Sequence, residues 1–193
     1  IIARRIMAAM EEGLAWASDP ESELELVHQV RTLELPRLQV SEAEYAMEKA
    51  IPTLMPEELE RQPWGFERRW PFGPVCDLIT RYERQGPDVK HPTECRIIRV
   101  GDVAFATSPF ELFMDYGARI RARSKALQTF LVQLADGSGD GFYLPTQRAL
   151  DGGHYSALIK SNWVGPEGGQ ILGEETVAAI AALFEGESYP TTR

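Results

Sequence analysis

The spacing of hydrophobic positions changes along the middle of the chain. Residues 95–107 form two apolar runs joined by a Gly-Asp pair, which is a signal for a two-residue β-hairpin. Residues 109–123 carry apolar side chains at helical spacing, and 128–135 form a mostly continuous apolar run, typical of a strand buried on both faces. The pattern predicts an α/β fold with a mixed sheet. Strands 103–107 and 128–135 should be parallel, because a strand-helix-strand unit nearly always makes a right-handed crossover between parallel strands.

The N-terminal part predicts a helix followed by a long strand. Apolar side chains recur every fourth position from Ile2 to Leu14, which indicates an amphipathic helix. Residues 24–35 alternate between apolar and polar, which predicts a strand with one face covered. His28 falls on the apolar side of that alternation, and we interpret it as a packed core histidine. The alternation changes parity near Thr32, so a bulge or bend is expected there.

Three further helices and one irregular segment are expected. Ser41 and Glu44 have the spacing of a capping box, which predicts a helix start. Helical patterns also occupy 75–86 and 171–186, and the second of these follows a Gly- and Pro-rich turn. Residues 52–74 are rich in proline and aromatic side chains, and they predict an irregular excursion that packs on the body of the protein.

Composition narrows the possible functions. A length of 193 residues fits about one domain, and we treat 1–193 as one. The net charge of −9 argues against general nucleic-acid binding, which needs clustered basic side chains. No apolar run approaches the ~18 residues of a membrane helix, so no transmembrane segment is expected. Cys76 and Cys95 lack metal-finger spacing; two buried thiols are the favoured interpretation, and a disulfide stays open.

The segment from Ser108 to Glu111 raises the first functional question. Ser-Pro-Phe-Glu has the pattern of a capping box with proline at the first helical position, and a cap contributes about 1 kcal/mol without any further role. However, the two parallel strands should end at one edge of the sheet, where open α/β folds bind ligands. Glu111 follows one strand end and Tyr143 follows the other. The two side chains are therefore expected on the same side of the molecule.

Other candidate metal ligands have weaker patterns. The glycine-rich stretch 136–141 begins like a calcium loop, but Gln147 stands where a bidentate glutamate is needed. A glycine-rich turn after a strand is the better interpretation. His91 and His154 show no ligand spacing, and each is interpreted as a loop histidine.

The second half of the chain resembles a known enzyme family. The stretches VGDVAFATSPFELFMDYGARIRARS, TFLVQLADGSGDGFYLPTQRAL and YSALIKSNWVGPEGGQIL are similar to the catalytic domain of neutral/alkaline, non-lysosomal ceramidases. They look most like the smaller bacterial relatives of unassigned substrate. The resemblance covers about 94–185.

The resemblance implies a zinc site. In the family, a glutamate near a helix start and a tyrosine followed by a small apolar residue and two threonines are zinc ligands; Glu111 and Tyr143 match these positions. This chain departs from the family at Phe110, which replaces a glycine, and in the glycine-rich loop before the tyrosine. No part of it matches the two histidine ligands, the serine nucleophile or the immunoglobulin-like C-terminal domain of the family. No catalytic residue is therefore assigned.

The resemblance also implies a function. It suggests the C-terminal part of a larger α/β hydrolase-like domain, a zinc-dependent amidase that hydrolyses an N-acyl amide bond in a small-molecule or lipid-like substrate. The rest of the polypeptide would lie upstream, and this chain alone would be catalytically incomplete and bind zinc weakly or not at all. Two alternatives stay open: a non-catalytic binding or scaffold module without metal, and an ordinary α/β domain in which Glu111 is a helix cap. The metal interpretation predicts that the Glu111 carboxylate and the Tyr143 hydroxyl lie within roughly 4–6 Å of each other, because both would reach one ion.

Overall fold

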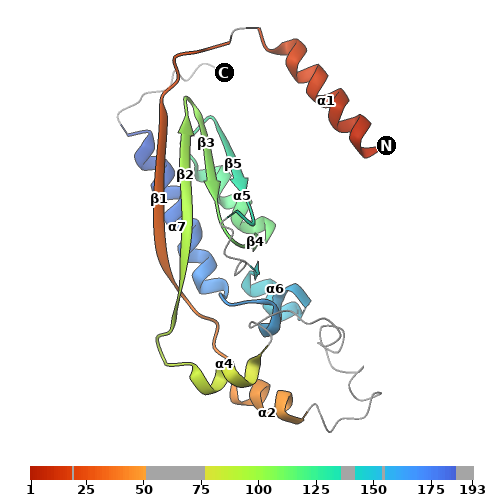
Figure 1. Ribbon diagram of the computed structural model, residues 1–193, viewed down its shortest axis with the longest axis vertical. Coiled ribbons are helices and arrows are strands. Elements are labelled where there is room, and N and C mark those ends of the chain that lie inside the picture. The colour runs from red at the N-terminus through yellow and green to blue at the C-terminus, as the bar shows by residue number, and fades with distance from the viewer. Residues whose placement is uncertain (19, 51–76, 136–141, 154, 186–193) are drawn as a thin grey trace.

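The computed structural model describes residues 1–18, 20–50, 77–135, 142–153 and 155–185 (Figure 1). In chain order, the elements are α1 (Ile2–Trp16), β1 (Leu26–Pro36), α2 (Glu42–Ala50), α4 (Leu78–Arg84), β2 (Lys90–Val100), β3 (Val103–Thr107), β4 (Glu111–Leu112), α5 (Met114–Arg123), β5 (Gln128–Val132), β6 (Tyr143–Leu144), α6 (Gln147–Gly152), the 3₁₀ turns η4 (Tyr155–Ala157) and η5 (Ile159–Ser161), and α7 (Pro166–Leu183). The predicted excursion at 52–74, the glycine-rich stretch 136–141, His154 and Cys76 lie outside the described residues.

A four-stranded mixed sheet organises the fold, with the strand order β1-β2-β3-β5. Strand β2 pairs antiparallel with both β1 and β3, and the β2–β3 turn has Gly101 in the left-handed conformation that such hairpins favour. Strand β3 pairs in parallel with β5, and α5 lies on the connection between them. The predicted α/β class, hairpin and parallel pair are thus confirmed, although β5 ends at Val132 rather than at 135.

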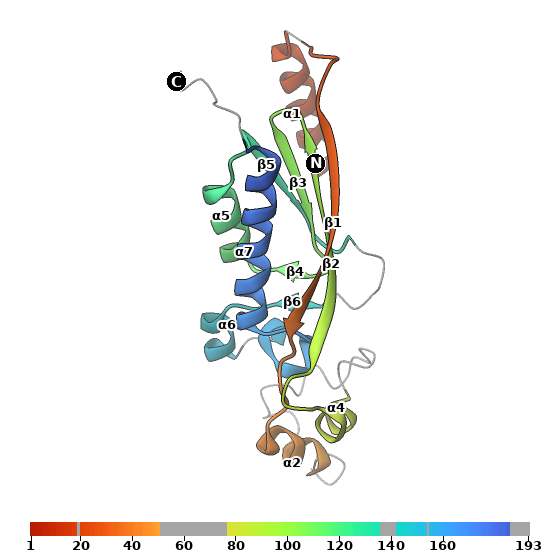
Figure 2. The same cartoon turned by 90° about the vertical axis from the view of Figure 1, so that its left-hand side faces the viewer.

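Helices α5 and α7 cover one face of this sheet (Figure 2). The buried side chains between the layers are Ile97, Ala104, Ala106, Ile120, Ala179, Ile180, Leu183 and Phe184. Helix α7 begins at Pro166, earlier than expected, with proline in its first turn. A second core cluster lies toward β4 and β6 and includes Leu35, Phe110, Leu144, Trp163, Val164 and Leu172.

The opposite face of the sheet carries exposed apolar side chains in the part of the chain that the structure describes. Leu26 is 70 % exposed and Val30 is 52 % exposed on β1, and Phe130 and Val132 are exposed on β5. The Phe130 ring stacks on Phe105 with their centroids 5.1 Å apart. The prediction that the 128–135 strand is buried on both faces is therefore wrong, because the helices pack on one side of the sheet.

The structure also corrects the description of β1. His28, interpreted as a core residue, is exposed together with its neighbours of the same parity, and the covered parity is that of Val27, Leu33 and Leu35. The expected bulge near Thr32 is wrong, since the β1–β2 register runs without interruption along the whole strand. His91, expected in a loop, lies in β2 and stacks on Trp163.

Helix α1 confirms the predicted N-terminal helix but contributes nothing to the core. None of its residues is buried, and Figure 1 shows it standing apart from the sheet. None of the described helices combines the length and apolar character that crossing a membrane requires.

Candidate functional site

The Ser108–Glu111 segment does not start a helix. The chain bends after β3, forms β4, and enters α5 with Phe113 as the residue before its first turn. Ser108 is buried, and its hydroxyl donates a long hydrogen bond to the Phe110 carbonyl at 3.4 Å. The predicted helix over 109–123 therefore starts later, at Met114, and the predicted capping box is wrong.

Burial of Phe110 explains this local structure. Its side chain is fully buried in the cluster with Leu35, Leu144 and Val164, and helix α5 starts beyond it. The backbone of the next residues is then satisfied by a strand partner instead of a helix turn. The Glu111 amide donates to the Phe142 carbonyl at 3.0 Å, and the Phe113 amide donates to the Leu144 carbonyl at 3.4 Å.

These bonds place Glu111 directly beside Tyr143. Strands β4 and β6 are parallel, and the Cα partners are Glu111 with Tyr143 and Leu112 with Leu144. Neighbouring strands lie about 4.8 Å apart, and successive side chains point to opposite faces. The structure thus brings together the two residues that the sequence places at one edge, through backbone pairing rather than through a helix cap.

Successive side chains along β4 and β6 alternate between the buried core and the outer side of the ladder. Leu144 is fully buried, whereas Glu111 is exposed and Tyr143 is half-buried. Paired residues share a face, so Glu111 and Tyr143 leave the ladder on its outer side. None of the residues that the structure describes forms a hydrogen bond or an ion pair with the Glu111 carboxylate. Within the described part of the chain, this carboxylate therefore has no competing partner.

Tyr143 meets a second tyrosine. Its hydroxyl lies 3.1 Å from the Tyr155 hydroxyl, and the two rings form an edge-to-face pair with centroids 5.7 Å apart. Side-chain hydrogen bonds fix the turn that carries Tyr155. The Ser161 hydroxyl donates to the Tyr155 carbonyl at 2.6 Å, and the side-chain amide of Asn162 donates to the Leu158 carbonyl at 2.8 Å. Two phenols and one carboxylate thus gather at the outer side of β4–β6.

The donor set fits part of a zinc site. Carboxylate oxygen is a common zinc ligand and phenol oxygen an unusual one, and Glu111 and Tyr143 supply one of each. Catalytic zinc sites need about three protein ligands, mostly histidine. In the described part of the chain, no group of three or more His, Cys, Asp and Glu residues is close enough to hold an ion. His28 lies on the open face of the sheet, and His91 packs against Trp163 and Phe110.

A separate pocket of about 230 Å³ lies between α4 and the chain after β1. The Arg37 guanidinium lies 3.9 Å from the centre of the Trp163 ring, and the Arg81 guanidinium lies 4.7 Å from it. Arg81 is buried and donates to the carbonyls of Ile159 and Leu38. These contacts tie α4 to the turn before α7.

Sequence reasoning missed two of these features. Tyr155 stands in a Gly-Gly-His-Tyr-Ser stretch that carries no helical or strand period, so nothing local marked it as a partner of Tyr143. The Arg37–Trp163–Arg81 stack joins three segments far apart in sequence, and no spacing rule predicts it.

Comparisons with protein-family models, with curated proteins and with solved structures found no match to this chain.

Proposed function

We propose that this chain is the C-terminal part of a zinc-dependent amide hydrolase similar to the neutral ceramidases, in which Glu111 and Tyr143 supply two of the metal ligands. The observation that carries the proposal is the direct pairing of these two residues across β4 and β6. The pairing brings a carboxylate and a phenol that are far apart in sequence to neighbouring positions, and two ligands of a single ion must lie close together in this way.

Each residue of the site has a defined task in this proposal. Bound zinc would supply Lewis acidity and an acidified water. Glu111 offers a carboxylate with no competing partner among the described residues. The Tyr143 oxygen accepts or donates one hydrogen bond with Tyr155, and that contact orients the phenol. The histidines and the nucleophile would come from the rest of the polypeptide, and the substrate would be an N-acyl amide of small-molecule or lipid-like type.

The incomplete donor set favours a second candidate function. A protein with this fold that has lost its histidines would retain the Glu111–Tyr143 pair without metal, and would act as a binding or scaffold module. The two proposals differ in what the full-length gene product contains, and in whether it loses activity when Glu111 is changed.

The deciding experiment measures zinc and amidase activity in the full-length gene product containing this sequence. The enzyme proposal expects about one zinc per chain and hydrolysis of N-acyl amides, both lost in Glu111→Gln. A matched control is Glu34→Gln, which changes an exposed strand glutamate on β1. Full-length protein without zinc and without hydrolysis would refute the enzyme and leave the scaffold.

The chain of 193 residues gives a complementary measurement. Calorimetry with zinc should show dissociation no tighter than about micromolar, because two oxygen donors make a weak site. Tyrosine NMR signals should locate the weak binding at Tyr143. A sub-micromolar site, or binding that ignores Glu111→Gln, would contradict the assignment of these residues as half of the metal site.

A further inference from the structure

The hydroxyl of Tyr116 lies where three segments around the β4–β6 ladder meet: the start of α5, the residue after β6 and the start of α7. Tyr116 is in the first turn of α5, shortly after β4, and its side chain is buried. Its hydroxyl donates to the Pro145 carbonyl at 2.9 Å, and Pro145 directly follows β6. The Pro166 carbonyl at the start of α7 lies 3.5 Å from the same oxygen. The Tyr116 hydroxyl therefore links α5, the helix that follows Glu111, to Pro145, which follows Tyr143 and β6.

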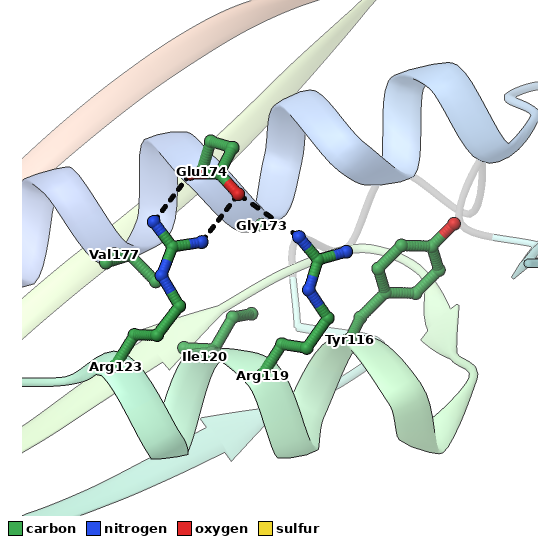
Figure 3. Close-up of a pocket in the computed structure, with 7 residues that line it drawn as sticks. All are labelled: Tyr116, Arg119, Ile120, Arg123, Gly173, Glu174 and Val177. Atoms are coloured by element: carbon green, nitrogen blue, oxygen red, sulfur yellow. Dashed lines mark hydrogen bonds and ion pairs between the residues drawn. The ribbon is translucent and has the colours of Figure 1, made fainter.

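Helix α7 is shaped to receive this hydroxyl. A Cβ atom at Gly169 would lie 2.3 Å from the Tyr116 oxygen, so only glycine permits the approach. A Cβ atom at Gly173, one turn farther along the same helix, would have nothing within 4 Å. Figure 3 shows the seam between the two helices, with Tyr116 pointing toward α7 and Arg119 and Arg123 reaching Glu174. The two helices thus pack most closely where the Tyr116 hydroxyl lies against Gly169 of α7.

The ladder itself is short. Strands β4 and β6 are two residues each, and at their ends the amides of Glu111 and Phe113 donate to the carbonyls of Phe142 and Leu144. A pair this short is not stable alone in water. We propose that Tyr116 is a positioning residue. Its hydroxyl holds β4 and β6 in register, and so keeps Glu111 beside Tyr143. Its value for catalysis rests on the proposed function, but the geometric claim does not.

The protonation of Tyr116 suits this task. Burial raises the pKa of Tyr116 to about 12. The hydroxyl therefore remains a hydrogen-bond donor throughout the neutral and moderately alkaline range. The phenol ring is buried in the cluster around Leu144, and a phenylalanine would retain those ring contacts.

The test uses Tyr116→Phe and Gly169→Ala in the 193-residue chain, with Gly173→Ala as the matched control for an added methyl group on α7. Amide hydrogen exchange is measured at Glu111 and Phe113, which donate to the carbonyls of Phe142 and Leu144, and at Ser108, whose amide donates to the β5 carbonyl of Val132. Both test variants should speed exchange at Glu111 and Phe113 about tenfold and leave Ser108 unchanged. The tyrosine ring signal of Tyr143 should shift in both variants and stay fixed in the control.

Three outcomes would overturn the proposal. Unchanged exchange at Glu111 and Phe113 would show that the ladder does not need the hydroxyl. Equal acceleration at Ser108 would show a general loosening of the fold. Global unfolding of both test variants would show that Tyr116 holds the whole core and not one ladder. Zinc titration is run separately on the same proteins, so failure of the metal proposal leaves the exchange result intact.

Discussion

Two segments of the chain with the pattern Ser-x-x-Glu, at Ser41 and at Ser108, fold differently. At Ser41 the pattern forms a complete capping box: the Glu44 amide donates to the Ser41 hydroxyl at 3.2 Å, and the Glu44 carboxylate accepts from the Ser41 amide at 2.7 Å. At Ser108 the equivalent glutamate, Glu111, lies in a strand and pairs with Tyr143. The same local signal therefore has two outcomes.

The residues between serine and glutamate explain the difference. In the first motif Glu42 and Ala43 are exposed, so nothing competes with the cap. In the second Pro109 and Phe110 are buried, and Phe110 is fully so. Burying a phenylalanine contributes ~2–3 kcal/mol, more than the ~1 kcal/mol of a cap. A Ser-x-x-Glu pattern thus forms a helix cap where its two intervening residues face solvent. It does not form one where an intervening residue is buried in the core.

Replacing Phe110 should break this comparison most strongly. Phe110→Ala removes a fully buried ring and should lower the free energy of unfolding by ~3–5 kcal/mol. Ala43→Gly, at the matching place in the first motif, should cost no more than about 1 kcal/mol. Urea unfolding followed by circular dichroism measures both. A loss below about 1 kcal/mol for Phe110→Ala would show that burial of this ring does not decide the local structure.

Removing the first cap should have an intermediate effect. Ser41→Ala eliminates the acceptor for the Glu44 amide and should destabilise the protein by about 1 kcal/mol. Because α2 packs against α4 through the stacked rings of Tyr45 and Tyr82, the loss should be felt at both helices. Ser41→Thr is the control, since threonine retains the hydroxyl that caps the helix and donates to Glu44. Equal destabilisation by both substitutions would argue that the hydroxyl is not acting as a cap.

Much of the fold could be predicted from sequence, because its signals are local. The Gly-Asp hairpin and the α2 capping box depend on neighbours within a few residues, and the crossover through α5 depends on three elements that follow one another along the chain. The covered face of β1 could not be predicted. Apolar side chains occupy both parities of that strand, and the position of the helices decides which parity is buried.

The candidate site divides in the same way. The shared edge of β3 and β5 was enough to predict that Glu111 and Tyr143 approach each other. The way in which they approach was not predictable, since it depends on Phe110 entering a core formed by Leu35 and Val164. The contact of Tyr155 with Tyr143 was not predicted, because it arises from a turn held by side chains rather than from a periodic element.

The helix cap of α4 adds a dependence on pH. The Asp77 carboxylate accepts from the Thr80 amide at 2.9 Å, and this hydrogen bond, helped by the Arg84 charge, holds the pKa of Asp77 below its usual range. A carboxyl with a lowered pKa in the folded state stabilises the protein above its ordinary pKa, and that stability is lost as the pH falls through the lowered value. Wild type should therefore lose slightly more stability than Asp77→Asn between about pH 5 and pH 2. Parallel curves for the two proteins would show that the cap charge contributes nothing.

The smallest effect is expected at Glu111 itself. Among the described residues nothing bonds to its carboxylate, and its backbone bonds with β6 survive any side chain except proline. Glu111→Ala should therefore change the free energy of unfolding by less than about 0.5 kcal/mol. Glu44→Ala, which removes the acceptor of two bonds from Ser41, should cost measurably more, about 1 kcal/mol.

This difference separates a structural glutamate from one kept for a ligand. If Glu111→Ala destabilised the chain as much as Glu44→Ala, the carboxylate would be stabilising the fold, and its availability to a metal would lose its basis. If Glu111→Ala is neutral for stability while Glu111→Gln removes zinc from the full-length protein, the carboxylate serves the site and not the fold. The pair of measurements therefore sharpens the comparison between these two Ser-x-x-Glu motifs. The Glu44 carboxylate accepts the Ser41 amide at a helix start, whereas Glu111 lies beside Tyr143 on the outer face of a two-stranded ladder.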